Sequence, residues 1–549
     1  MIQKIIVFLL SFVFLLAGVA CADYTDTGTS DSVSVSQSEE TEKAVNRVRF
    51  SRIPEGVERY DAVKVYVGET ELPLYSVQVN TSQSWTPNQY KRKPNGVGLL
   101  ELEGKVTLTI VPNVQLNYST VVRPLSANVV TVADVAANKL YVTLRSSGEY
   151  VVEINGDKYD AVHLFVSDYG SFPDTAAYRN VMIFEAGLHT SANDSRISKA
   201  QNAVNVPSDT LVWLRDGAVV RAKFSADRAN HIAIVGRGVI DGSTFDRDAS
   251  SEHYTVTVPI DCNHCTDVLL SDFSVLDPAG WTVNFYFIEN ARIDDIKIIS
   301  SRSNGDGISL QSCKNIEVTG CFVRTWDDSL VVKNYPRWEN RSEQGATKHI
   351  RFADCTVWTD LAQCMEVGYE TVGKELTDVA FENITVLHAL HNAVMSIHNA
   401  NNADVKDVRW KDITVEDGYS TTGTLLEVRV QFHSTWSVNH TITELGSVSS
   451  VSVENVKVIS AKSIVFVLGG SYDTRSGYQG AHYVDGVFIS GVSLAGKTVP
   501  EGKYVLKDCG YLENFSYRMA ESVTGASFSF SASAEDLAAY GEKTEVEVL

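Results

Sequence analysis

A short phrase recurs along the middle of the chain and limits the folds that the chain can adopt. A strand-like run, a corner of Asn, Asp or Gly, and a second strand-like run occur in residues 379–386 and again in 408–415. Further copies share this pattern and begin at Val268, Ile293, Ile316, Ile350, Val451 and Val487. Successive copies start 25, 23, 34, 29, 29, 43 and 36 residues apart. This period predicts a parallel β-helix rather than a propeller, whose blades need four strands, or a leucine-rich repeat, whose Leu/Asn pattern is absent.

The region before the repeats has a different all-β pattern. Alternating runs such as 63–67 and 106–110 are separated by Gly, Pro and Asn, and no helical periodicity competes with them. Residues 47–166 are therefore predicted to form a β-sandwich. The expected architecture is all-β, an N-terminal β-sandwich followed by a right-handed parallel β-helix of about ten coils. Residues 167–509 would form the helix and 510–549 a C-terminal cap.

The N-terminus has the features of an export signal. Lys4 precedes an apolar stretch over residues 5–20, so residues 1–22 are predicted to be a signal peptide. The run before Cys21 is similar to a stretched bacterial lipobox, although ordinary cleavage beside Ala22 also fits. Residues 23–46 are rich in Ser, Thr and acids and are predicted to be a disordered tether. We expect an exported protein, either a periplasmic or cell-surface lipoprotein held by a lipid on Cys21 or a secreted protein; no later stretch is predicted to span a membrane.

The net charge and the cysteines limit the kinds of partner that the chain is expected to bind. The formal net charge of −21 argues against nucleic acid, which needs a surplus of Lys and Arg. It argues more weakly against an anionic polysaccharide, since a local basic surface could still bind one. Cys262 and Cys265 have the spacing of half a zinc site, but no second close pair accompanies them. They are expected to be small buried residues or a disulfide, and neither a metal nor a cofactor is predicted.

Carboxylates gather at corresponding places of consecutive repeats. Four of them follow the start of their own repeat at similar distances along the chain, namely Asp306, Asp327, Asp328 and Glu366. Equivalent positions of successive coils stack about 4.8 Å apart, so these groups should lie near one line. Stacked carboxylates raise one another's pKa, which suits metal binding or acid–base catalysis such as glycoside hydrolysis. The structural alternative is that corner aspartates satisfy turn backbone groups, above all Asp306, which precedes Gly307.

The same aspartates carry a resemblance to known families. Asn304-Gly305-Asp306-Gly307, followed 21 residues after Asp306 by Asp327 and Asp328, resembles glycoside hydrolase family 28, the polygalacturonases, and its relative family 49, the dextranases and isopullulanases. The junction over residues 152–165 is also similar to family 49, which places a sandwich before its β-helix. The resemblance covers roughly residues 47–508. It implies an inverting hydrolase with Asp327 as general acid and Asp306 and Asp328 as activators of water.

Two departures from family 28 bear on the substrate. Polygalacturonases carry a Gly-His-Gly turn and an Arg-x-Lys that grips the substrate carboxylate, whereas residues 365–370 here read Met-Glu-Val-Gly-Tyr-Glu and 396–399 read Ser-Ile-His-Asn. We therefore expect a neutral glycan such as an α-glucan rather than polygalacturonate, with a polygalacturonase-like pectin hydrolase as the alternative.

Further candidates could bind the carbohydrate. Aromatic rings stack on sugars, and polar side chains bond their hydroxyls, although packing would explain the same residues. The candidates are Trp281, Asn304, Trp326, Lys333, Glu366, Tyr369, Glu370 and His398. Two rival functions stay open. A polysaccharide lyase would use the carboxylates to hold calcium and Lys333 as base, and a glycan-binding surface protein would need no catalysis.

Overall fold

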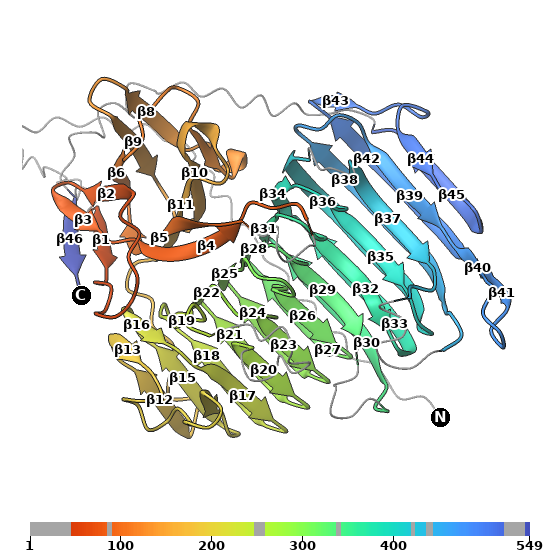
Figure 1. Ribbon diagram of the computed structural model, residues 1–549, viewed down its shortest axis with the longest axis horizontal. Coiled ribbons are helices and arrows are strands. Elements are labelled where there is room, and N and C mark those ends of the chain that lie inside the picture. Colours follow the sequence, from red (N-terminus) through yellow and green to blue (C-terminus); the bar gives the residue numbers. More distant parts are fainter. Residues whose placement is uncertain are drawn as a thin grey trace, which may run out of the picture. The chain divides into compact units, whose positions relative to one another are not determined.

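The described part of the chain is built almost wholly of strands (Figure 1). The computed structural model describes residues 46–84, 91–245, 258–335, 342–418, 423–434, 443–520 and 544–549. The predicted signal peptide, Cys21 and all of the predicted tether except Asn46 lie outside these residues. The described residues belong to one compact unit, Val45–Leu549. Within them, no helix has the length and apolar character needed to cross a membrane.

The N-terminal part is a β-sandwich, as predicted. One sheet has five strands in the order β3 (Thr70–Leu72), β2 (Val63–Val67), β6 (Val106–Pro112), β9 (Lys139–Leu144) and β8 (Val130–Asp134). The other has seven strands, β46 (Glu545–Val548), β1 (Arg47–Phe50), β5 (Arg92–Glu103), β11 (Ala161–Asp168), β10 (Gly148–Glu153) and β7 (Val121–Arg123), with β4 (Tyr75–Asn80) on β5. Strands β2 and β6 alternate buried and half-buried residues, which is why their Val, Leu and Ile side chains fill the space between the sheets.

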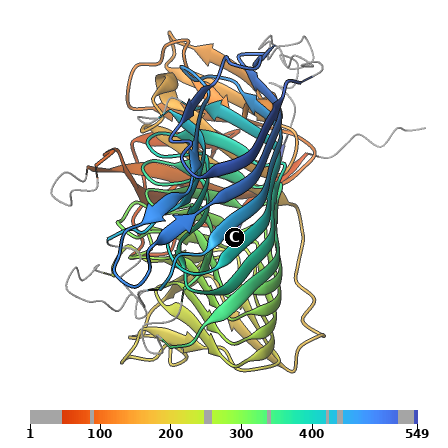
Figure 2. The ribbon, with the colours of Figure 1, turned by 90° about the vertical axis from the view of Figure 1, so that its right-hand side faces the viewer.

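Apart from a separate antiparallel hairpin of β40 (Ser471–Asp473) and β41 (Gly480–His482), the remaining strands form a parallel β-helix, which confirms the predicted fold class (Figure 2). The helix has three faces. The face that carries the candidate site, called the third face, is an 11-stranded parallel sheet with one strand per coil. The strands are β14 (Ala203–Asn205), β17 (Lys223–Asp227), β20 (Ile260–Asn263), β23 (Val283–Tyr286), β26 (Ile308–Gln311), β29 (Leu330–Asn334), β32 (Met365–Thr371), β35 (Met395–Asn399), β37 (Thr424–Val430), β39 (Val465–Gly469) and β44 (Val505–Lys507).

The other two faces belong to one continuous 21-stranded sheet. The first face contains β12 (Asn180–Phe184), β15 (Thr210–Leu214), β18 (Asn230–Val235), β21 (Thr266–Ser271), β24 (Glu289–Asp294), β27 (Lys314–Thr319), β30 (Gly345–Ala353), β33 (Gly373–Glu382), β36 (Asp404–Asp417), β38 (Ser447–Val458), β42 (Val484–Leu494) and β45 (Leu512–Arg518). The second face contains β13 (Gly187–His189), β16 (Ala218–Val220), β19 (Val239–Asp241), β22 (Ser274–Leu276), β25 (Lys297–Ile299), β28 (Phe322–Thr325), β31 (Thr356–Thr359) and β34 (Thr385–Ala389). The two-residue strand β43 (Lys497–Thr498), antiparallel to β42, completes the sheet.

The corner residues explain the repeated phrase. Between the first and second faces the backbone turns through the left-handed region, which Gly, Asn and Asp adopt most readily. The corner residues with positive φ are Asp272, Asp295, Gly320, Asp354, Asn383, Asp412, Asn455 and Gly491. Apolar residues on either side of each corner point into one continuous core.

The interior also contains the cysteines. Six of the seven described cysteines are buried and all seven are free thiols, so Cys262 and Cys265 form no disulfide. Cys321 and Cys355 lie two residues after the paired residues Thr319 and Ala353, in the same place of successive coils. They are part of the packed core.

The C-terminal residues 510–549, expected to form a cap, are shared by the two domains. Strand β45 pairs with β42 and so adds to the helix. Strand β46 pairs with β1 in the sandwich, with Glu545 opposite Arg47. The chain therefore returns to its N-terminal domain.

The sandwich packs on the second face of the helix. One apolar cluster combines residues of β4, β5, β10 and β11 with residues of β16, β19, β22, β25, β28, β31 and β34. Its members include Tyr75, Val77, Val79, Phe165, Ile299, Phe322 and Trp358. The contact brings the end of β4 close to the loops that precede β26 and β29.

Candidate active site

Two of the predicted aspartates occupy the same position in successive coils. Strand pairing sets Val283, Ile308, Leu330 and Met365 side by side on the third face. Two residues earlier, the equivalent positions are Trp281, Asp306, Asp328 and Gln363. The hydrogen bonds between the backbones of neighbouring coils extend as far as these positions. Gly307 N–H donates to the Asp328 carbonyl oxygen (2.9 Å), and Ser329 N–H donates to the Gln363 carbonyl oxygen (3.0 Å).

The three aspartates have different hydrogen-bond partners. Asp327 accepts the backbone N–H of Asn304 at Oδ2 (2.9 Å) and that of Asp328 at Oδ1 (3.1 Å). Asp328 accepts the backbone N–H of Gln363 at Oδ1 (3.0 Å). Asp306 Oδ1 is buried and accepts no hydrogen bond from any residue that the structure describes. The Asp306 carboxyl therefore has a buried oxygen whose hydrogen-bonding capacity no described group of the protein uses.

Burial and mutual repulsion set the protonation of this group. All three aspartates are buried, with an exposed fraction of 2% for Asp306 and 7% for Asp327 and Asp328. Burial, followed by the neighbouring charge of Asp327, raises the pKa of Asp306 to about 8. The same causes, with Asp306 added, raise the pKa of Asp328 well above its ordinary value. The cluster therefore retains a proton at neutral pH, as acid catalysis requires.

Lys333 lies between two carboxylates. Its Nζ is 3.5 Å from Asp306 Oδ2 and 3.4 Å from Glu370 Oε2, and it lies 5.2 Å from the centre of the Trp281 ring. Burial would lower the pKa of this ammonium, but Glu370 and Asp306 together raise it well above its ordinary value. Lys333 thus remains charged, and its charge is compensated by the protein.

A second set of charges continues along the third face from Glu366. This residue pairs in register with Val331, three residues beyond the line of Asp306 and Asp328, so the expected alignment of four carboxylates holds for only part of the set. The Glu366 carboxylate accepts hydrogen bonds from Ser396 Oγ and from His398 Nδ1 (2.8 Å). Glu366 belongs to the surroundings of Asp328, whose pKa it helps to raise.

His398 is a buried cation with two anionic neighbours. Its Nε2 is 3.7 Å from Glu427 Oε1, opposite the bond to Glu366. Burial alone would lower its pKa, but Glu366 and then Glu427 raise it to about 10. The Tyr369 ring stacks on the imidazole with centroids 4.1 Å apart. Beyond Glu427, Arg429 contacts both that carboxylate (3.4 Å) and Asp508 (2.5 Å).

The two tryptophans predicted to stack on sugars have different surroundings. Trp281 is next to Asp306 in the line of equivalent positions and packs edge-to-face against Tyr335 (5.4 Å between centroids). Trp326 is fully buried, and its indole N–H donates to the carbonyl oxygen of Ser82 in the sandwich (2.9 Å). For Trp326 this arrangement matches the packing alternative, because both the ring and its donor are used inside the protein.

Sequence reasoning missed two elements of this site. Gln363 takes the place in line after Asp328 and forms a hydrogen bond with the Tyr369 hydroxyl. It could have been found by counting back from the start of β32 instead of forward from the repeat. The other element is the sandwich segment 80–82, which no repeat pattern connects to the helix. Among the described residues, no group of three or more His, Cys, Asp or Glu could hold a metal ion.

Several solved structures are similar to this chain. Dex49A from Penicillium minioluteum is 13% identical, with a TM-score of 0.48 over 83% of this chain and 96% of that chain. A hyperthermoactive exopolygalacturonase from Thermotoga maritima is 16% identical, with a TM-score of 0.44 over 62% of this chain and 84% of that chain.

Sequence comparison places a family match over the candidate site. A probable polygalacturonase from Vitis vinifera is 25% identical over 170 residues, which cover 30% of this chain and 33% of that protein. The chain thus spans about a third of the length of this curated relative. The model described as Glycosyl hydrolases family 28 matches residues 188–359. The resemblance to family 28 that the aspartates predicted is therefore confirmed for the segment that carries Asp306, Asp327 and Asp328.

Proposed function

We propose that this protein is a glycoside hydrolase that cleaves a neutral polysaccharide or oligosaccharide with inversion at the anomeric carbon. The observation that carries the proposal is the buried group of Asp306, Asp327 and Asp328, which holds a proton and an unsatisfied carboxyl oxygen at one place on the third face. Hydrolysis with inversion needs one protonated and one ionised carboxyl group on opposite sides of the bond, about 6.5–9.5 Å apart. The family 28 match supports the same reaction class.

The proposed roles are those that the resemblance to family 28 implies. Asp327 donates its proton to the glycosidic oxygen as the bond to the anomeric carbon breaks. Asp306 and Asp328, which share one line, hold a water between them, and one of them takes the proton that the water loses as its oxygen bonds to the anomeric carbon. The free oxygen of Asp306 supports this placement of the water.

One observation favours the opposite assignment. The two backbone N–H groups bonded to Asp327 stabilise its ionised form, whereas the raised pKa values of Asp306 and Asp328 favour a proton on one of these two. Interacting carboxyls share their protons, so substrate binding can move the proton within the group. A leaving-group experiment, described below, separates the two assignments.

The charge pattern supports a neutral substrate. Among the described residues, the two cations nearest the aspartates and Glu366 are compensated by carboxylates of the protein: Lys333 by Asp306 and Glu370, His398 by Glu366 and Glu427. Arg429 is likewise paired with Glu427 and Asp508. An anionic sugar would have to displace one of these pairs and would meet the charge of Glu366 beside His398.

The alternative substrate is polygalacturonate, which the match to family 28 and to a probable polygalacturonase favours. A lyase reaction with Lys333 as base is less well supported, because the pKa of this ammonium is raised rather than lowered.

The proposal is tested by incubating the purified full chain with dextran, other neutral α-glucans, galactans and polygalacturonate. Released reducing ends are measured, with Asp306→Asn, Asp327→Asn and Asp328→Asn as controls. We expect release from a neutral glycan that all three substitutions abolish or strongly reduce. Release from polygalacturonate alone would establish the alternative substrate, and an unsaturated product absorbing in the ultraviolet would establish a lyase.

A further inference from the structure

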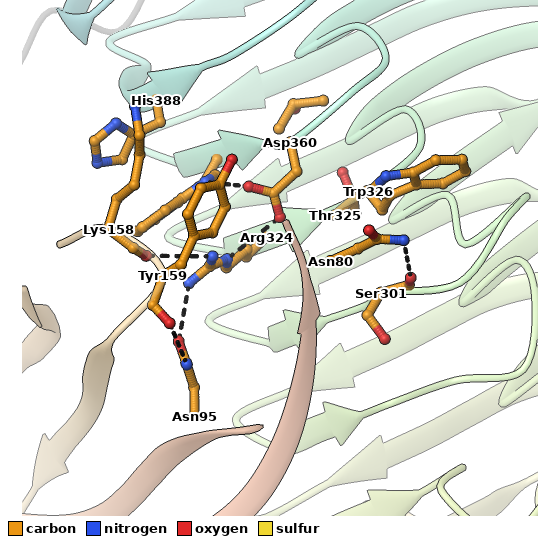
Figure 3. Close-up of polar contacts among 12 residues, drawn as sticks. Asn80, Asn95, Lys158, Tyr159, Ser301, Arg324, Thr325, Trp326, Asp360 and His388 are labelled. Carbon is orange, nitrogen blue, oxygen red and sulfur yellow. Dashed lines mark hydrogen bonds and ion pairs between the residues drawn. The ribbon is translucent and has the colours of Figure 1, made fainter. Parts of the chain in front are cut away.

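One short segment of the sandwich contacts both loops that carry the aspartates. The segment begins with Asn80, the last residue of β4, whose side chain is fully buried and faces Ser301 (Figure 3), and it continues to Ser82. We call residues 300–307 the Asp306 loop and residues 326–329 the Asp327 loop. They lie in successive coils and precede β26 and β29.

The first contact is with the Asp306 loop. Asn80 Nδ2 donates to the carbonyl oxygen of Ser301 (3.2 Å). Three residues further on, Asn304 donates its backbone N–H to Asp327 Oδ2 (2.9 Å). The other side of the Asn80 amide, Oδ1, accepts the backbone N–H of Ser82 (3.0 Å). This bond fixes the shape of the segment itself, so the position of Ser301 is set relative to Ser82.

The second contact is with the Asp327 loop. The carbonyl oxygen of Ser82 accepts the indole N–H of Trp326 (2.9 Å), and Trp326 directly precedes Asp327 in the chain. The Trp326 side chain is buried, so this bond is shielded from water. Thr325, on the other side, bonds through Oγ1 to the Asp327 carbonyl oxygen (2.6 Å).

The segment can act as a fixed reference because its surroundings are well packed. Val77 and Val79 of β4 belong to the apolar cluster shared by the sandwich and the second face. Arg324 of β28 is also fully buried. Its guanidinium donates to Asn95 Oδ1 (3.5 Å) and lies 3.2 Å from His163 Nε2, and both of these residues belong to the sandwich. The strand that leads into the Asp327 loop is therefore also held from the sandwich side (Figure 3).

We infer that residues 80–82 set the separation between Asp327 and the Asp306–Asp328 pair, with Asn80 and Trp326 as positioning residues. The inference rests on the proposed function, in which these aspartates act on opposite sides of one bond. The two loops are also bonded to each other directly, through Asn304 N–H to Asp327 Oδ2 and Gly307 N–H to the Asp328 carbonyl oxygen, and residues 80–82 add a common attachment on the sandwich side. An error of about 1 Å in the placement of a catalytic group can cost on the order of 10²-fold in rate. The sandwich is on this account part of the catalytic geometry.

The test makes the same substitution at two tryptophans, and each variant loses an indole N–H. Trp326→Phe keeps a buried ring but removes the donor to Ser82. The matched control is Trp410→Phe, because Trp410 of β36 is equally buried and its indole N–H has no hydrogen-bond partner among the described residues. We expect Trp326→Phe to lower kcat by roughly 10- to 100-fold with KM little changed, as for a loss of positioning. Trp410→Phe should retain wild-type kcat.

A second variant approaches the same geometry from the sandwich. Asn80→Ala removes the bond to Ser301 without altering the helix, and it should also lower kcat more than KM. Both variants should lose less on a substrate with a good leaving group, since such a substrate needs little help from an acid. A variant that merely contained less folded protein would lose the same fraction on both substrates.

The outcomes separate this inference from the proposed function. Wild-type kcat in Trp326→Phe and Asn80→Ala, beside a strong loss in Asp327→Asn, would overturn the positioning role alone. An equal, leaving-group-independent loss in Trp326→Phe and Trp410→Phe would overturn it as well. Full activity in Asp327→Asn would overturn the proposed function itself.

Discussion

Asp306 and Asp328 occupy the same position in two successive coils, joined by the hydrogen bond from Gly307 N–H to the Asp328 carbonyl oxygen (2.9 Å). Their backbones are therefore stacked about one strand spacing apart, roughly 4.8 Å, and both side chains are buried. Like charges this close do not both ionise easily. Burial and the charge of Asp327 beside both of them raise their pKa values, so these stacked aspartates retain a proton.

The pH dependence of activity should reflect the proton that the aspartates retain. Below about pH 8 the cluster retains the proton that the leaving oxygen needs, and above it Asp306, whose pKa is raised to about 8, is ionised. We expect kcat/KM to fall as the pH rises through about 8, and to fall also at acid pH, where no ionised carboxylate is left to accept a proton from water. Intrinsic fluorescence over the same range controls for unfolding. A rate that climbs steadily into alkaline pH would contradict this account.

Substitutions of the aspartates should identify the acid. Asp327→Asn should lower turnover of the polysaccharide by roughly 10²–10⁴-fold, and by much less with an aryl glycoside whose leaving group needs no proton. Asp306→Asn should lose activity equally on both substrates, because water must be activated in either case. If the two variants show the reverse pattern, Asp306 is the acid, and the pKa directions identified it better than the resemblance did.

Glu366 should control the charge of His398. Because Glu366 is the main group that raises the pKa of His398 to about 10, Glu366→Gln should lower that pKa, which an NMR titration of the imidazole resonances measures. The exposed Glu317→Gln, on the first face, is the matched control and should leave it unchanged. A His398 pKa that stays near 10 in Glu366→Gln would assign the effect to Glu427 instead.

The fold and part of the site could be predicted from the sequence for one physical reason. Each coil needs a left-handed corner, so Asn, Asp and Gly recur where the first face ends, as at Asn383 and Asp412. This recurrence predicts the parallel β-helix and places Asp306, Asp327 and Asp328 in neighbouring coils. The repeat does not, however, fix the length of the chain between the first and third faces. Ala291 and Ile316 are paired in register, yet the stretch from Ala291 to Ile308 is longer than the equivalent stretch from Ile316 to Leu330.

Variable turn lengths explain the errors at the site. Counting from the repeat placed Glu366 near the line of aspartates, whereas Gln363 takes that position and Glu366 faces His398 from the strand itself. The burial of Trp326 had a different cause, since its partner Ser82 is 244 residues away in another domain. Contacts of that kind leave no periodic signal in a chain.

The stability of the protein should depend on the buried ion pair of Arg324 and Asp360. Its guanidinium lies 3.6 Å from the Trp358 ring centre and 3.7 Å from Asp360 Oδ2, and both charged side chains are fully buried. Arg324→Met leaves the Asp360 carboxylate without its cation, which should lower the free energy of unfolding by about 3–5 kcal/mol. Arg351→Met, in an exposed network with Glu317 and Glu382, should cost only about 0–1 kcal/mol. Equal urea midpoints for the two variants would show that the buried pair contributes nothing.

The most direct test of the proposed mechanism is the anomeric configuration of the first product. A neutral glycan that the enzyme cleaves is followed by ¹H NMR from the first minutes, before mutarotation equilibrates the new reducing end. Attack by a water held between Asp306 and Asp328 predicts a product of inverted configuration. A product of retained configuration would mean a covalent intermediate and carboxyl groups about 5–5.5 Å apart, and it would contradict the roles assigned to all three aspartates.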